Sequence, residues 1–152
     1  MIYPLNDQWY FTKQYWDELP TDSGDDPTRF EKVRIPHTNQ LLPRNYCNEE
    51  EYQMVSGYVR EVWADEAWKD QHISLRFDGA AHEAAVFCNG QEICIHRCGY
   101  TAFEADITKA VAFGVKNRIV VRLEEFIVRS GFWFGIKATL PRFLSGEIWM
   151  DI

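Results

Sequence analysis

The sequence is short of positive charge: 16 lysines and arginines stand against 23 acidic residues, which gives a formal net charge of −7. Proteins that bind the phosphate backbone of nucleic acids gather lysine and arginine on one face, where these side chains replace condensed counterions. This composition offers no such surplus. We therefore expect that nucleic acid is not a partner of the chain.

The sequence also lacks a long apolar run. Pro4, Asn6 and Asp7 stand where a signal peptide needs an uninterrupted hydrophobic stretch. No other segment reaches the roughly 20 apolar residues that cross a bilayer as a helix. We expect no membrane association and a cytoplasmic protein.

Cysteine is sparse, with 4 residues in 152. A chain of this length buries enough core to fold without disulfide bonds, and an even number of cysteines does not by itself indicate a disulfide framework. In the absence of a secretory signal, free thiols are the expected state of all four.

Three residues of metal-ligating type alternate along one predicted strand, namely Cys94, His96 and Cys98. A two-residue turn at Asn89–Gly90 would pair Val86 with Ile93 and would place Cys88 on the opposite face from Cys94. The fourth ligand is then missing, and consecutive strand positions lack the paired loop spacing of structural zinc sites. We expect no metal site and no cofactor.

Aromatic residues, in contrast, are abundant, with 6 Trp, 7 Tyr and 10 Phe. Part of this surface is expected to fill a bulky core. Another part is expected to line a binding surface or an interface, because exposed apolar patches on a lone domain mark a missing partner. The apolar fraction of 46% is ordinary, so residues 1–152 are predicted to form a single globular domain.

Apolar and polar side chains alternate in a series of short segments, which is the period of a half-buried β-strand. The predicted strands cover residues 8–15, 31–35, 58–64, 72–77, 84–88, 91–96, 117–125 and 146–152. Asn89–Gly90 and Asp78–Gly79 are predicted turns, and Asp106 is predicted to cap a short helical turn. Short strands without a crossover helix predict an all-β fold, an antiparallel β-sandwich of the jelly-roll type.

Two segments show no period. Residues 37–56 contain Pro43 and three consecutive glutamates and predict a long connection, either functional or a solvated linker. Residues 126–144 mix glycines with isolated aromatic residues and predict no clear element.

Several motifs follow one another in a fixed order along the chain. They are VRIPHT at 33–38, LPRNY at 42–46, SGYVR at 56–60, RFDGA at 76–80, AVFCNG at 85–90, GYTAF at 99–103, DIT at 106–108 and Asn117. In order and spacing they resemble the N-terminal sugar-binding domain of glycoside hydrolase family 2, the β-galactosidase and β-glucuronidase family, and are most similar to β-galactosidase-type members. Residues 126–143 lack the Asp and the proline run that members carry there.

The resemblance implies a galactose-binding-domain-like jelly roll that is a fragment of a larger enzyme. Such a domain shapes the mouth of the active site and packs on a catalytic barrel and an immunoglobulin-like domain, and the full enzyme is expected to be a homo-oligomer. The acid and nucleophile glutamates belong to the barrel. We therefore expect no catalytic residue among these 152 and no activity of the chain alone.

The resemblance also implies a role for Asn48, which follows Tyr46 in the long connection. In β-galactosidases of the family, an Asn or Asp of the first domain reaches the active site and contacts sugar hydroxyls. An amide suits this task because it offers both donors and acceptors. The alternative is that Asn48 supports a turn before the acidic run at 49–51.

Two other functions are compatible with the same sequence. One is an independent carbohydrate-binding module, in which Trp and Tyr rings stack on sugar faces. The other is a structural or oligomerisation domain, whose exposed aromatic residues contact a neighbour.

Overall fold

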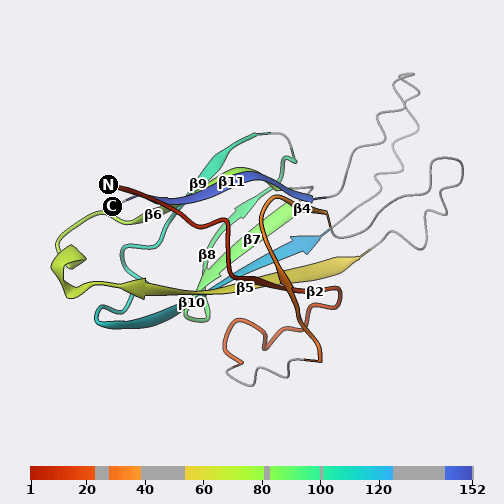
Figure 1. Cartoon of the computed structure of the whole chain (residues 1–152), viewed down its shortest axis with the longest axis horizontal. Coiled ribbons are helices and arrows are strands. Elements are labelled where there is room, and N and C mark those ends of the chain that lie inside the picture. Colours follow the sequence, from red (N-terminus) through yellow and green to blue (C-terminus); the bar gives the residue numbers. More distant parts are fainter. Residues whose placement is uncertain (23–27, 39–53, 81–82, 100, 125–142, 152) are drawn as a thin grey trace, which may run out of the picture.

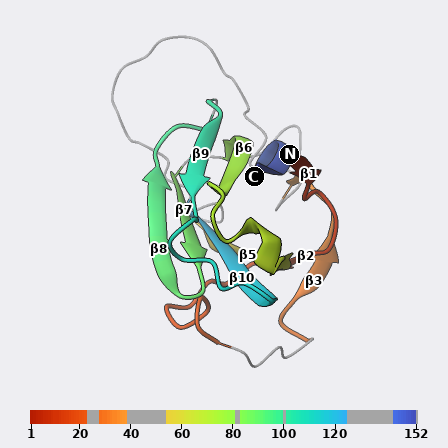
Figure 2. The same cartoon turned by 90° about the vertical axis from the view of Figure 1, so that its left-hand side faces the viewer.

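The computed structural model describes residues 1–22, 28–38, 54–80, 83–99, 101–124 and 143–151 of the chain. These residues form two antiparallel β-sheets that lie face to face (Figures 1 and 2). The described residues also contain the 3₁₀ turn Glu66–Trp68. No helix among them is long and apolar enough to cross a bilayer. The predicted all-β sandwich is confirmed.

The two sheets differ in size. The five-stranded sheet has the order β1-β11-β6-β9, with β4 also paired to β11; its strands are β1 (Ile2–Pro4), β4 (His37–Thr38), β6 (Ser74–Ala80), β9 (Phe103–Asp106) and β11 (Phe143–Asp151). The six-stranded sheet has the order β3-β2-β5-β10-β7-β8; its strands are β2 (Trp9–Thr12), β3 (Glu31–Val33), β5 (Val55–Ala64), β7 (Glu83–Cys88), β8 (Gln91–His96) and β10 (Val115–Glu124).

The main core lies between the sheets and follows the predicted alternation. On β10, Ile119, Val121 and Leu123 point inward and are almost fully buried, and they meet Leu75 and Phe77 of β6 from the other sheet. Each such side chain contributes about 1.5–3 kcal/mol when it is fully removed from water. The alternating apolar residues therefore determine which face of each strand turns inward.

A second, smaller apolar cluster covers the outer face of the six-stranded sheet. Leu19 lies on Val59 of β5 and Val120 of β10, and these three side chains are buried. The side chains packed around them are Tyr15, Trp16, Phe30 and Phe87. The segment that follows β2 thus folds back over its own sheet, which leaves aromatic residues half-buried on the outside of the sandwich.

The hairpin between β7 and β8 has the predicted turn, because Asn89 and Gly90 both have positive φ, at 51° and 83°. Its predicted register is wrong beyond the turn. Phe87 pairs with Glu92, but Val86 pairs with Cys94, because Ile93 is the extra residue of a β-bulge. The bulge turns Cys94 toward the same face as Val86 and Cys88, whereas the regular alternation predicted opposite faces.

Asp78–Gly79 does not form the predicted turn. Both residues belong to β6, where Gly79 pairs with Ser145 of β11. The register of β11 shifts between Ser145 and Ile148, opposite this part of β6. A glycine inside a strand often marks such a bulge, which explains why the Asp-Gly signal was misleading here.

The ends of one strand also differ from the prediction. β2 is shorter than the predicted strand 8–15, because Gln8 has a φ of 63° and the Thr12 hydroxyl donates to the carbonyl of Gln14 in a local turn. Asp106 caps a short turn as predicted: its Oδ1 accepts from the Thr108 amide at 3.0 Å, and the Val111 amide donates to the Ile107 carbonyl at 3.0 Å.

Two asparagines tie the hairpin tip to the start of β10. Asn117 is buried, and its Oδ1 accepts hydrogen bonds from the Ala112 amide and from Asn89 Nδ2, both at 2.7 Å. Its Nδ2 donates to the Ala112 carbonyl at 2.8 Å. Asn89 in turn accepts from the Arg118 amide at 2.9 Å. One side-chain amide therefore satisfies both backbone groups of Ala112.

We expect Asn117→Ala to lower the free energy of unfolding by about 2–3 kcal/mol, because it removes several hydrogen bonds that a buried side chain makes to Ala112 and Asn89. Urea unfolding followed by tryptophan fluorescence measures this loss. Lys116→Ala is the matched control, since Lys116 is the exposed neighbour and its ion pair with Glu61 lies in solvent. Equal losses in the two variants would contradict the assigned role of Asn117.

Candidate functional site

Four strand ends meet at one end of the sandwich, which we call the rim. In the five-stranded sheet Thr38 pairs with Phe143, and in the six-stranded sheet Val55 pairs with Glu124. Only residues 81–82 separate the rim ends of β6 and β7, so the two pairs lie at the same end (Figure 1, right). The residues that bound 39–53 and 125–142 are therefore gathered at the rim.

An aromatic cluster under the rim links the two sheets. His37 of β4 places its Nδ1 2.9 Å from the hydroxyl of Tyr58 on β5. Phe11 of β2 packs on both rings, with centroid distances of 4.8 Å to His37 and 4.9 Å to Tyr58. Tyr58 is fully buried. The cluster fixes the position of His37, one residue before the last described residue on that side of the rim.

The protonation of His37 is governed by this packing. Burial lowers the pKa of the imidazole below its ordinary value, and the charge of Glu31 opposes the shift without cancelling it. A neutral ring can make the contact with Tyr58 in either tautomer. Its Nδ1 accepts a hydrogen bond from the hydroxyl when it carries no proton, and donates one to the hydroxyl when it does.

Asn48, the predicted sugar-contacting residue, lies in 39–53 and thus outside the described residues. The structure describes the residues on either side of this stretch, Thr38 on β4 and Met54 before β5. The role of Asn48 stays a prediction.

Glu83 and Glu124 are register partners across β7 and β10, so they invite comparison with the paired carboxylates of a retaining glycosidase. Arg122 Nη2, however, lies 3.6 Å from Glu83 Oε1 and 3.5 Å from Glu124 Oε2. Arg97 also pairs with Glu83, with its Nε 2.7 Å from Oε2. A guanidinium occupies the space between the carboxylates that a sugar would need. We therefore assign these residues to an ion-pair cluster.

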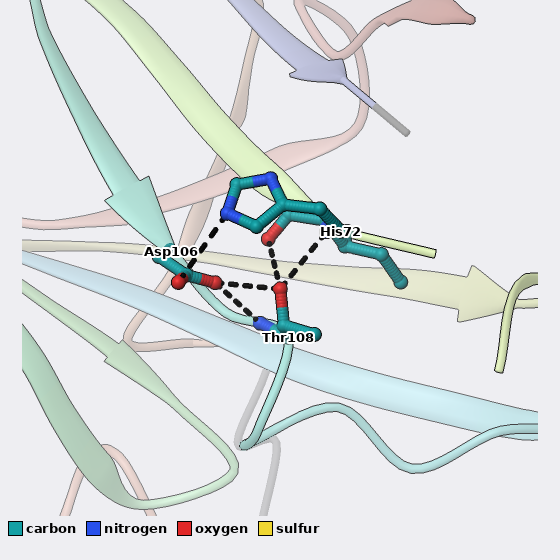
Figure 3. A network of polar contacts seen from close by, with 4 residues as sticks. His72, Asp106 and Thr108 are labelled. Atoms are coloured by element: carbon teal, nitrogen blue, oxygen red, sulfur yellow. Dashed lines mark hydrogen bonds and ion pairs between the residues drawn. The ribbon is translucent and has the colours of Figure 1, made fainter. Parts of the chain in front are cut away.

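His72, Asp106 and Thr108 are the residue types of a hydrolase triad, and Figure 3 shows them in contact at the end of β9 away from the rim. The Thr108 hydroxyl donates to Asp106 Oδ1 at 2.6 Å and accepts from the Ile73 amide at 2.9 Å. His72 Nε2 contacts Asp106, at 3.3 Å. In a triad the histidine must contact the nucleophile. The arrangement is therefore a hydrogen-bonded cap between strands. The hydroxyl and the amide of Thr108 both donate to Asp106, and these hydrogen bonds lower the pKa of its carboxyl group.

The described cysteines, Cys88, Cys94 and Cys98, form no disulfide within the described part of the chain. Burial raises the pKa of Cys88 to about 11, and burial together with the charge of Glu92 raises the pKa of Cys94. Thiols in such surroundings are poor nucleophiles. In the described part of the chain, no three His, Cys, Asp or Glu side chains come together as a metal site.

The sandwich and its motifs match a known family. The sequence profile of the "Glycosyl hydrolases family 2, sugar binding domain" aligns with residues 22–132. The chain belongs to this family. A β-galactosidase of Thermoanaerobacterium thermosulfurigenes is 40% identical over 106 residues, which cover 70% of this chain and 14% of that enzyme. A β-galactosidase of Thermoanaerobacter pseudethanolicus is 35% identical over 116 residues, covering 72% and 16% respectively.

Solved structures show the same fold. The β-glucuronidase 2 of Bacteroides uniformis, covalently bound to cyclophellitol-6-carboxylate aziridine, aligns with a TM-score of 0.80 and 25% identity over 99% of this chain and 17% of that chain. A family 2 member from Bacteroides cellulosilyticus aligns with a TM-score of 0.77. The chain thus spans about a sixth of the length of its relatives and corresponds to their sugar-binding domain.

We expect NMR titration of the four histidines to show that the His37 ring ionises below about pH 6.5, because burial disfavours the imidazolium. The unfolded chain then binds a proton on His37 more tightly than the folded chain does. Stability is therefore lost as the pH falls from about 6.5 through the folded pKa. The variant His37→Gln assigns the signal, and a His37 titration above pH 6.5 would contradict the packing described.

Proposed function

We propose that this family 2 domain forms part of the active-site mouth in a complete retaining glycosidase that acts on β-galactosides. The observation that carries this proposal is the rim, where strands of both sheets flank residues 39–53 and a buried Tyr58–His37 contact fixes one of the flanking strands. The choice of β-galactoside is supported by the two β-galactosidase relatives, whose identities of 40% and 35% exceed the 30% of a Bacteroides fragilis β-glucuronidase.

The chemistry is assigned to polypeptide outside this domain. Retaining hydrolysis needs one carboxyl group that protonates the leaving oxygen and a second, about 5–5.5 Å away, that attacks the sugar. The register pair Glu83 and Glu124 is already engaged by Arg122, so it offers no open nucleophile. The domain instead contributes a rigid wall, and rigid elements hold a substrate-contacting loop more accurately than an unsupported loop does.

Within that wall, Asn48 is proposed to hydrogen-bond sugar hydroxyls through its side-chain amide. The support is its place in the stretch bounded by the rim, together with the family resemblance of the flanking motifs. The cytoplasm remains the proposed location, and the buried thiol of Cys88 and the half-buried thiol of Cys94, which form no disulfide within the described residues, are consistent with a reducing compartment.

We expect the purified 152-residue chain to release no nitrophenol from p-nitrophenyl β-galactoside or p-nitrophenyl β-glucuronide above a buffer control. Glu83→Gln serves as the matched control, because contaminating activity would be unchanged by it. Turnover by the chain that disappears in Glu83→Gln would overturn the assignment of chemistry to another domain.

In the full-length protein that carries this domain, we expect Asn48→Ala to lower kcat/KM for β-galactosides by about 10- to 100-fold, the effect of one or two hydrogen bonds lost in the transition state. Asn45→Ala is the control, since it removes an amide from the same stretch. Both variants should unfold at the same temperature as the parent. A kcat/KM equal to that of the parent would remove Asn48 from the site.

A further inference from the structure

A groove lies on the outside of the sandwich, where the segment after β2 runs beside the approach to β3. Its volume is about 590 Å³, which is within the range of small-ligand sites. Its lining residues are Phe11, Thr12, Lys13, Gln14, Tyr15, Trp16, Thr28, Arg29, Phe30 and Glu31. The function proposed above assigns no ligand to this groove, although Phe11 also packs on His37, and Trp16 and Phe30 also pack on the outer cluster.

The groove offers aromatic surface on a firm base. The rings of Trp16 and Phe30 are 5.9 Å apart and inclined by 55°, and both are half-buried against the outer cluster around Leu19. Because that cluster fixes the rings before any ligand arrives, little conformational entropy is lost on binding. Such rings present an apolar face, which suits the C–H face of a pyranose.

Polar groups of several kinds surround the rings. Gln14 and Glu31 are exposed, and the Arg29 guanidinium lies over the face of the Trp16 ring, 5.4 Å from its centre. Arg29 is also exposed, so a sugar that stacks on this face would displace the guanidinium to the side of the ring. An amide, a carboxylate and a guanidinium together supply planar donors and acceptors that match neighbouring hydroxyl pairs. Lys13 and Arg29 against Glu31 leave one excess positive charge, which is too little to select a polyanion.

We propose that this groove binds a neutral β-linked oligosaccharide, stacked on Trp16 and hydrogen-bonded by Gln14 and Glu31. The groove adjoins the rim, because the Tyr15 amide donates to the Val55 carbonyl at 3.0 Å. The choice of a carbohydrate rests on the proposed function, whereas the groove itself does not. A longer substrate chain held here remains close to the active-site mouth.

The test uses the isotopically labelled 152-residue chain and β-1,4-galactotetraose, with cellotetraose as the second probe. We expect saturable shifts of the Trp16 indole signal and of the Gln14 and Glu31 amides, with a dissociation constant on the order of 1 mM for at least one probe. Trp16→Phe and Gln14→Ala should each weaken binding at least threefold. Gln14 is exposed, so its variant should fold even if Trp16→Phe does not.

Trp63→Phe is the matched control, because Trp63 is 57% exposed and lies outside the groove. It should bind as the parent does. No saturable shift with either probe at 20 mM, shifts confined to His37 and Tyr58, or equal weakening in Trp63→Phe would each overturn the proposal. Loss of binding in the full-length protein would also overturn it, since another domain would then cover the groove. None of these readouts depends on Asn48, so the two proposals fail separately.

Discussion

The antiparallel pairing of β5 with β10 is the interaction on which the rest of the structure depends. The two strands pair without interruption from Val115–Ala64 to Glu124–Val55. Their inner faces supply Tyr58, Val62, Ile119 and Val121 to the main core, while Val59 and Val120 support the outer cluster. One continuous ladder therefore orients both apolar layers, and its two free ends define the rim and the opposite end of the sandwich.

Buried polar groups appear where the ladder meets irregular chain. At one end Asn117 and Asn89 complete the backbone hydrogen bonds of a turn, and at the other the Tyr58 hydroxyl meets His37. A buried polar atom without a partner costs about 1–3 kcal/mol, so each of these contacts restricts the alternatives open to the chain. The same physical requirement thus stiffens the turn and holds the strand that flanks the proposed mouth.

The sequence predicts local features of this fold more accurately than distant ones. Asn89 and Gly90 specify their turn because both residues accept positive φ, and the alternation of Ile119 and Val121 specifies which face of β10 is buried. The bulge at Ile93 carries no glycine or proline, so no local signal marks it. β1 spans three residues that pair with residues near position 150, a contact that no short pattern encodes.

The site could be predicted to a similar extent. The predicted strand at 31–35 corresponds to β3, whereas β4 lies at positions 37–38, inside the predicted connection, so its pairing with β11 was not predicted. The contact of His37 with Tyr58, 21 positions away, and the covering of Val59 by Leu19 depend on tertiary packing. The groove at Trp16 could not be predicted for the same reason, since Trp16 and Phe30 lie outside the predicted strands and meet only after the chain folds back over its own sheet.

The proposed division of labour between domains is consistent with these constraints. A sandwich whose apolar residues face inward on every central strand has few places for the open, desolvated carboxylates that retaining hydrolysis needs, and Glu83 and Glu124 are paired with Arg97 and Arg122 instead. What a rigid sandwich supplies well is position: a misplacement of about 1 Å in a substrate-contacting group can cost about 100-fold in rate. A groove fixed on the outer face and a rim fixed by Tyr58 are both positional devices of this kind, joined through Tyr15 and Val55. Under the function proposed above, the domain would hold the ends of a sugar chain still while another domain performs the chemistry.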